Sequence, residues 1–199
     1  MAALGGGVDR WQIGDRVGVA WLAGSCGECA RCRAGDENLC DLAEFTGWDR
    51  DGGYTEVMVA RADFAFSIPD TFSDTEAAPL LCGGVIGYRS LKISGIRPGG
   101  RLGLYGFGAS ALLALQVARH WDCEVYVATR SAAERQRALE FGAVWAGGYD
   151  EAPPVGLDAA VTFAPVGSVV VAALRAIVPG GTVAINAIHL DEIPAFDYD

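Results

Sequence analysis

The stretch Arg101-Leu-Gly-Leu-Tyr-Gly-Phe-Gly-Ala-Ser-Ala111 decides the fold of the second half of this 199-residue chain. Its apolar start predicts a strand at 101–105, and the spacing Gly106-x-Gly108-x-x-Ala111 then opens a helix. The first glycine permits a tight turn, the second lets the backbone approach a pyrophosphate, and the small third residue packs the helix on the strand. Phosphate would lie on the free N–H groups of the helix start, which include those of Ala109 and Ser110. A tight turn without a ligand would explain this motif alone, so the flanking elements must decide.

The elements after this motif favour a dinucleotide site. Apolar runs and helical spacing predict strands at 124–129, 144–145, 157–163 and 182–186, with helices at 109–120, 131–141 and 169–178. Ser131 is the expected N-cap of the second helix, and Gly142 its stop. Strands that alternate with helices indicate an α/β fold with a parallel, doubly wound sheet.

The end of the second strand bears on which coenzyme would bind. An acidic residue about 20 positions after the glycine motif would bind the ribose 2′-hydroxyl and select NAD. The sequence there reads Thr129-Arg130-Ser131 and contains no carboxylate. Arg130 could neutralise a 2′-phosphate, which favours NADP over NAD. Alternatively, Arg130 stacks on the adenine or points to solvent.

The first half of the chain predicts short strands around a cysteine-rich loop. Strands are expected at 16–22, 54–60 and 64–68, separated by glycine turns. Between the first two lies the spacing C-x2-C-x2-C-x7-C, formed by Cys26, Cys29, Cys32 and Cys40. Pairs three residues apart are unsuited to disulfides but typical of thiolates that converge on a metal ion. The loop therefore predicts a closed, structural zinc site, in preference to free thiols or a redox pair.

The remaining cysteines and the histidines give weaker signals. On pattern alone, Cys82 is expected to be a buried thiol, and Cys123 has no functional interpretation. His120 is expected to end a helix, and His189 to follow the last strand.

Composition and charge exclude several classes of protein. The chain has 15 basic and 25 acidic residues, a formal net charge of −10. Nucleic-acid binding needs clustered basic residues, so this balance argues against it. No apolar run approaches the roughly 20 residues of a membrane helix, and the start lacks the features of a signal peptide. We therefore expect a cytoplasmic protein with neither nucleic-acid nor membrane partners.

A zinc loop upstream of a G-x-G-x-x-A domain resembles the zinc-containing alcohol dehydrogenases of the medium-chain dehydrogenase/reductase (MDR) superfamily. The resemblance covers essentially the whole chain. Its motifs are Gly14-Asp-Arg-Val-Gly18, Asp51-Gly-Gly-Tyr54, Pro79-Leu-Leu-Cys-Gly-Gly84 and Gly103-Leu-Tyr-Gly-Phe-Gly-Ala-Ser-Ala111. It implies a partial GroES-like domain at 1–79, with a zinc lobe at 24–42, and a Rossmann domain with five of six strands at 80–199.

The resemblance also implies roles for individual residues. Cys26, Cys29, Cys32 and Cys40 would bind the structural zinc, and Cys82 would be a ligand of the catalytic zinc. The coenzyme would be held by Gly106, Gly108, Ala109, Ser110, Ala111, Thr129, Arg130, Ala164 and Ile188. The substrate would be a small alcohol or aldehyde, and the full-length form would be a homo-oligomer. Trp48 would line the substrate cleft or pack within its loop.

Departures from the family pattern lead to a further expectation. No Cys or His precedes Cys26, so two of the three catalytic zinc ligands have no counterpart. The sixth strand of the sheet also has none. We expect an inactive fragment of a zinc alcohol dehydrogenase, with about one zinc per chain. The alternative is a non-catalytic module that binds zinc and a nucleotide; the four cysteines argue against a zinc-free quinone reductase relative.

Overall fold

The computed structural model describes residues 1–197, and the chain divides into two compact units, Met1–Cys82 and Gly83–Asp199. No helix among the described residues is long and apolar enough to cross a membrane.

The second unit is built on a five-stranded parallel sheet. Its strands are β5 (Arg101–Tyr105), β6 (Glu124–Ala128), β7 (Trp145–Gly147), β8 (Leu157–Thr162) and β9 (Ile177–Ile185). They lie in the order β7-β6-β5-β8-β9. The chain first forms β6 and β7 on one side of β5, and then β8 and β9 on the other side. Ligands bind outside the carboxyl ends of parallel strands at such a reversal, here between β5 and β8. The predicted doubly wound sheet is confirmed.

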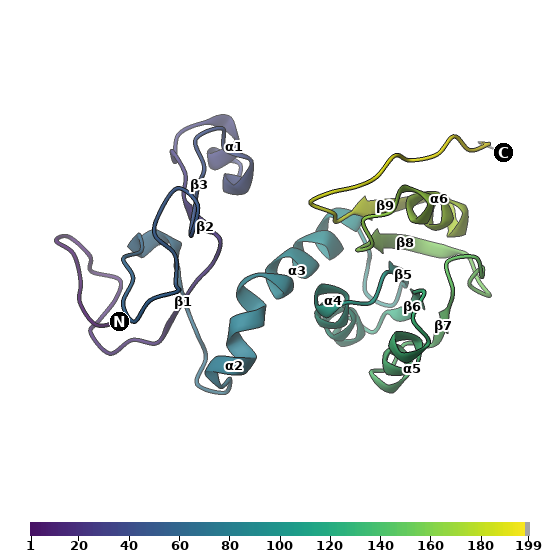
Figure 1. The fold of residues 1–199 in the computed structure, drawn as a ribbon, viewed down its shortest axis with the longest axis horizontal. Helices are drawn as coiled ribbons and strands as arrows, with labels where there is room; N and C mark the ends of the chain where they lie inside the picture. The colour runs from purple at the N-terminus through teal and green to yellow at the C-terminus, as the bar shows by residue number, and fades with distance from the viewer. Residues whose placement is uncertain (198–199) are drawn as a thin grey trace. The chain divides into compact units, whose positions relative to one another are not determined.

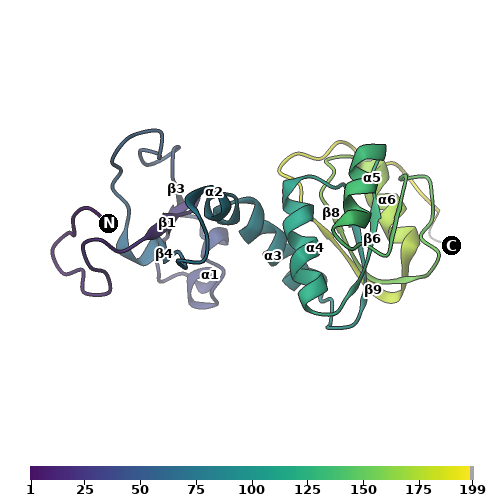
Figure 2. The same ribbon diagram turned by 90° about the horizontal axis from the view of Figure 1, so that it is seen from below.

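Helices cover both faces of this sheet. One face packs against α3 (Gly83–Ser94), α4 (Ala109–His120) and α5 (Ala132–Glu140), through a core that includes Leu91, Leu115 and Ala138. The other face packs against α6 (Gly167–Ala176) through Val169 and Ala173. Figure 1 shows α6 on one side of the strands and α4 and α5 on the other, and Figure 2 shows the same helices from below. Strands β5, β6 and β8 are almost wholly buried, which explains their nearly continuous apolar sequences, whereas most of β9 is exposed or half-buried.

The first unit contains two short antiparallel strand pairs. β1 (Val17–Val19) pairs with β4 (Ala65–Ser67), and β2 (Leu22–Gly24) pairs with β3 (Glu44–Phe45). Its helices are α1 (Ala30–Arg33) and α2 (Asp74–Ala77), with 3₁₀ turns at Glu37–Leu39, Ala62–Phe64 and Ala78–Leu81. Few residues of this unit are buried; Trp11 is one, and its indole N–H donates to the carbonyl of Ala62 at 2.8 Å.

The strand predicted at 54–60 is wrong. The segment has no regular structure, and Val57 and Val59 are 72% and 90% exposed. Its alternating apolar residues have the composition of a strand, but no strand within residues 1–197 pairs with it to satisfy its backbone groups. The strand predicted at 16–22 is two strands, because β1 ends at Val19 and β2 begins at Leu22.

Two features near Cys82 differ from what the sequence predicts. Cys82 is exposed, so its interpretation as a buried thiol is wrong. Helix α3, which follows it, was not predicted, because its small and glycine residues weaken the helical signal. The structure explains Gly87: a Cβ there would lie 2.9 Å from the backbone oxygen of Ser110, so α3 and α4 pack closely.

Candidate functional site

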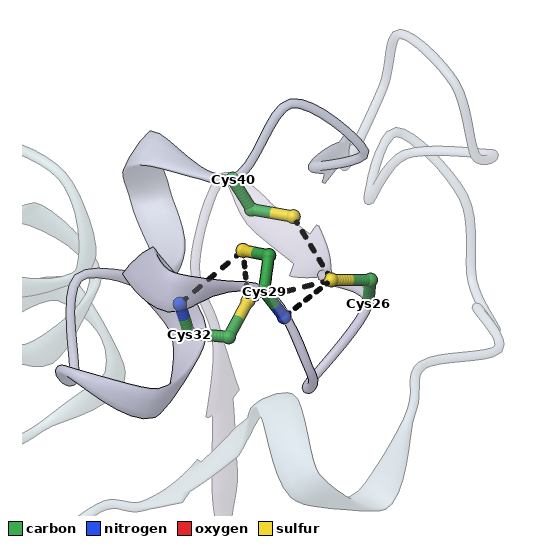
Figure 3. Close-up of side chains that lie close together, drawn as sticks. All are labelled: Cys26, Cys29, Cys32 and Cys40. Carbon is green, nitrogen blue, oxygen red and sulfur yellow. Dashed lines mark hydrogen bonds between the residues drawn. The ribbon is translucent and has the colours of Figure 1, made fainter.

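The first candidate site is the cluster of Cys26, Cys29, Cys32 and Cys40. Their side chains point toward one another from the loop around α1 and the 3₁₀ turn that follows it (Figure 3). All four sulfur atoms lie within 4.8 Å of one another. Among the described residues, no other group of three or more Cys, His, Asp or Glu side chains converges in this way.

The sulfur spacing fits a tetrahedral zinc ion. Four sulfurs at about 2.3 Å from Zn²⁺ are separated from one another by about 3.8 Å. The distances between Sγ atoms are 3.8 Å for Cys26–Cys32, 3.5 Å for Cys29–Cys32 and 3.6 Å for Cys26–Cys40. All four cysteines are free thiols. The donor set therefore suits zinc, and four protein ligands leave no open position for a substrate.

Backbone N–H groups surround these sulfurs. The amide of Cys29 donates to Sγ of Cys26 at 3.3 Å, that of Cys32 to Sγ of Cys29 at 3.4 Å, and that of Leu42 to Sγ of Cys40 at 3.3 Å. Such donors stabilise thiolates and orient them toward a metal. Gly27, with φ of 77°, provides the turn between the first two cysteines.

The cluster also shifts the thiol pKa values. A hydrogen bond from Ser25 lowers the pKa of Cys32 to about 7, and backbone hydrogen bonds from Glu28 and Cys29 lower that of Cys26. The Cys32 amide acts to lower the pKa of Cys29, but the hydrogen bond between the two thiols and burial raise it to about 11. The cluster thus favours thiolates at Cys26 and Cys32, the form that binds metal.

The second candidate site is a cavity of about 710 Å³ at the carboxyl ends of the parallel strands. All nine residues that the sequence assigns to the coenzyme line it: Gly106, Gly108, Ala109, Ser110, Ala111, Thr129, Arg130, Ala164 and Ile188. They come from the ends of β5, β6, β8 and β9 and from the start of α4. The fold therefore brings together residues that lie far apart in the sequence.

The glycine turn leaves room where a phosphate would approach. Gly106 has φ of 93°, and a Cβ there would lie 2.9 Å from the backbone nitrogen of Ala164. A Cβ on Gly108 would meet nothing within 4 Å, so the backbone is open to the cavity. Gly108 is the N-cap of α4, and no side chain caps the helix start. Its first N–H groups therefore lack intrahelical partners and can donate to an anion.

The β6 end of the cavity carries charged and polar side chains. Arg130 is exposed, and no hydrogen bond or ion pair of its guanidinium is found within residues 1–197. The hydroxyl of Thr129 donates to Oε2 of Glu134 at 2.5 Å. Tyr149 also lines this end, and burial is the main cause that raises its pKa. Sequence reasoning missed Glu134, because it lies beyond the position where an acidic residue was sought.

The β9 end of the cavity adds residues that sequence reasoning missed or left without a role. Asn186 and His189 line this end beside Ile188. The buried Nδ2 of Asn186 has no hydrogen-bond partner among the described residues, so a ligand with acceptor groups would suit this wall. A polar residue directly after the carboxyl end of a parallel strand is the signal that could have identified Asn186.

Cys82 does not form part of a metal cluster. It is exposed, and the only convergent set of ligating side chains within the described part of the chain is the four-cysteine cluster. The residues described do not fit an open catalytic zinc site, which needs three protein ligands. We therefore derive no catalytic step through a zinc ion at Cys82.

Comparison with known proteins places these sites in context. Residues 1–70 match the family model "Alcohol dehydrogenase GroES-like domain". The chain is 53% identical over 197 residues to a probable alcohol dehydrogenase, AdhA, of Mycobacterium tuberculosis. The aligned region covers 99% of this chain and 56% of that protein. The chain thus spans little more than half the length of this relative.

Solved structures share the fold at lower sequence identity. A Helicobacter pylori structure described as CAD complexed with NADP(H) superposes with a TM-score of 0.84 at 27% identity, over 95% of this chain and 56% of that one. A putative zinc-binding dehydrogenase from Sinorhizobium meliloti, bound to NADP, gives a TM-score of 0.84 at 28% identity, over 98% and 61%. Each of these two structures therefore covers residues of both units of the chain.

Proposed function

The chain belongs to the zinc-containing alcohol dehydrogenases of the MDR superfamily, and we propose on this basis that it carries the coenzyme site and the structural zinc site of such an enzyme. The reaction of the whole protein would transfer a hydride between a small alcohol or aldehyde and NADP or NAD. The coenzyme, when bound, supplies the hydride acceptor or donor.

One observation supports this proposal above the others: nine residues assigned from the sequence line a single cavity where the parallel strands end. The open turn at Gly108 and the free N–H groups of α4 would bind the pyrophosphate. Thr129 and Arg130 would lie at the adenosine ribose, and Ala164 and Ile188 at the opposite end of the coenzyme. Arg130 favours the 2′-phosphate of NADP, and the Helicobacter pylori and Sinorhizobium meliloti structures contain that coenzyme.

The four cysteines would hold zinc for structural reasons. The loop of residues 24–42 has few apolar side chains, so a metal ion would take the place of a hydrophobic core. Because this site has four protein ligands, it would not contact the substrate. Cys82 would contribute one ligand to a catalytic zinc in the complete enzyme.

The isolation of Cys82 favours a second candidate function for this chain by itself. A single exposed thiolate cannot hold Zn²⁺ in an open tetrahedral site. The chain would then act as a non-catalytic module that binds zinc and a nucleotide.

A coenzyme titration, paired with an activity assay, tests both proposals. Adding NADPH and NADH separately to the zinc-loaded chain should give saturable binding by calorimetry. The chain should not reduce the oxidised coenzymes when small alcohols are added. Absence of saturable binding of either coenzyme would overturn the proposed site. Alcohol-dependent reduction of coenzyme would instead contradict the non-catalytic role.

A further inference from the structure

The position of the adenosine ribose within the cavity is the premise of this inference, which rests on the proposed coenzyme function. In doubly wound domains the ribose 2′ position lies near the end of the second strand, about 20 residues after the glycine motif. Here that place is Thr129 and Arg130, which follow β6 and line the cavity. Groups that contact these residues therefore decide whether a hydroxyl or a phosphate is accepted.

Glu134 places a carboxylate at this position. It is the only acidic residue among the described residues that line the cavity, and it is half-buried. Its Oε2 accepts a hydrogen bond of 2.5 Å from the Thr129 hydroxyl, and its backbone N–H donates to Oγ of Ser131 at 3.3 Å. Both ends of the residue are therefore fixed, and the carboxylate is held beside the expected ribose.

The neighbouring charges do not neutralise this carboxylate by direct contact. The guanidinium of Arg135 binds backbone oxygens: its Nη1 donates to the carbonyls of Thr129 at 2.8 Å and Arg130 at 3.2 Å. Arg130 forms no ion pair with Glu134 or with any other residue in the part of the chain that the structure describes. Tyr149 completes the surroundings. Burial is the main cause that raises the pKa of its phenol; the Thr129 hydrogen bond acts to lower this pKa, Glu134 to raise it and Arg130 to lower it. One carboxylate and one guanidinium thus face the same part of the cavity.

We propose that Glu134 is a specificity-determining residue for the coenzyme. Its carboxylate accepts a hydrogen bond from the adenosine ribose and repels a 2′-phosphate, whereas Arg130 attracts that phosphate. The opposing charges let the site accept NADH as well as NADPH. A ribose hydroxyl can donate to a carboxylate, but a phosphate brings only acceptor oxygens and negative charge.

The Glu134→Gln variant tests this role. Glutamine has the same shape, and its amide oxygen can still accept the hydrogen bond from Thr129, so the local fold should be preserved. We expect the ratio of the Kd for NADPH to the Kd for NADH to fall by about tenfold, the effect of losing one charge-assisted interaction. The fragments 2′,5′-ADP and 5′-AMP should show the same shift, because they contain only the adenosine half.

The matched control is Glu140→Gln, which removes the same charge from the exposed end of α5, where the carboxylate accepts a hydrogen bond from Gln136. It should leave the Kd ratio unchanged. A Kd ratio in Glu134→Gln within twofold of that of the unmodified chain, or an equal shift of this ratio in the control, would overturn the inference. Neither result would contradict the proposed coenzyme site. Failure of the unmodified chain to bind any of the four ligands would instead overturn the proposed function, and the inference with it.

Discussion

Gly106 and Gly108 show how two glycines of one motif serve different purposes. Gly106 needs a left-handed backbone and close contact with Ala164, whereas Gly108 has an ordinary φ of −88° and open space beside it. The first glycine is therefore required by the fold, and the second by the ligand that the motif would bind.

Alanine substitutions should separate these two requirements. Gly106→Ala should destabilise the fold by about 1–3 kcal/mol, because a Cβ there strains the backbone. Gly108→Ala should change stability by less than about 0.5 kcal/mol but weaken coenzyme binding at least tenfold, since its methyl group occupies the pyrophosphate approach. Thermal unfolding of both variants measures the change in stability, and coenzyme titration measures the change in affinity. Unchanged affinity in Gly108→Ala would contradict the placement of the pyrophosphate.

At the scale of elements, Asp158 joins the first strand of the sheet to its neighbour. Its Oδ2 accepts from the backbone N–H of Arg101 at 2.8 Å, and its Oδ1 forms an ion pair with the guanidinium at 3.0 Å. The side-chain hydrogen bond from Arg101, followed by the backbone one, lowers the pKa of Asp158 below its ordinary value of 3.8. The charged form is thus the one that stabilises the pair β5–β8.

Asp158→Asn should reveal this contribution through its pH dependence. Since folding lowers the pKa, the stabilisation is present above the unfolded value of 3.8 and is lost as pH falls through the folded value. The pair is partly exposed, so we expect a loss of about 1 kcal/mol at neutral pH. Urea unfolding should show a lower free energy of unfolding for Asp158→Asn than for the original chain at pH 7, and no difference between them in strong acid. The exposed Asp150→Asn serves as control, and a deficit independent of pH would argue against an ionic cause.

The elements that the sequence predicted correctly are those with strong local signals. The bounds of β5 and α4 are as predicted, because an apolar run and a helical repeat meet at an obligatory glycine turn. The predicted start of β9, at residue 182, was too late, because Pro179 and the glycines after it suggested a turn. In the structure β9 begins at Ile177. The segment 54–60 failed because a strand depends on a partner that sequence periodicity does not reveal.

The sites were predictable to different degrees. The cysteine spacing alone predicted that the four sulfurs converge, since these residues are close in sequence. The cavity residues were found through a general motif and a family resemblance. Glu134 lay outside that motif, because its carboxylate reaches the cavity from α5 and not from the strand end.

At the scale of the whole molecule, the two sites belong to separate compact units. The cysteine cluster lies within Met1–Cys82, and all residues that line the coenzyme cavity lie within Gly83–Asp199. We therefore expect each unit to have its own source of order: a zinc ion held by the four cysteines in the first, and a buried parallel sheet in the second.

Removing the metal should affect only the first unit. Binding of structural zinc is worth about 10–16 kcal/mol in small zinc domains, so a chelator should unfold the cysteine loop. Hydrogen exchange should then increase within residues 24–42 and remain unchanged in β5, β6 and β8. Coenzyme affinity should be the same before and after chelation. A parallel loss of coenzyme binding would contradict the separation of the two sites.

X-ray absorption at the zinc edge tests the assignment of the cysteine cluster most directly. On protein purified from zinc-supplemented medium, we predict about one zinc per chain, with four sulfur neighbours at about 2.3 Å. A metal-free protein that retains its folded loop, or a zinc ion surrounded by nitrogen and oxygen, would contradict the account.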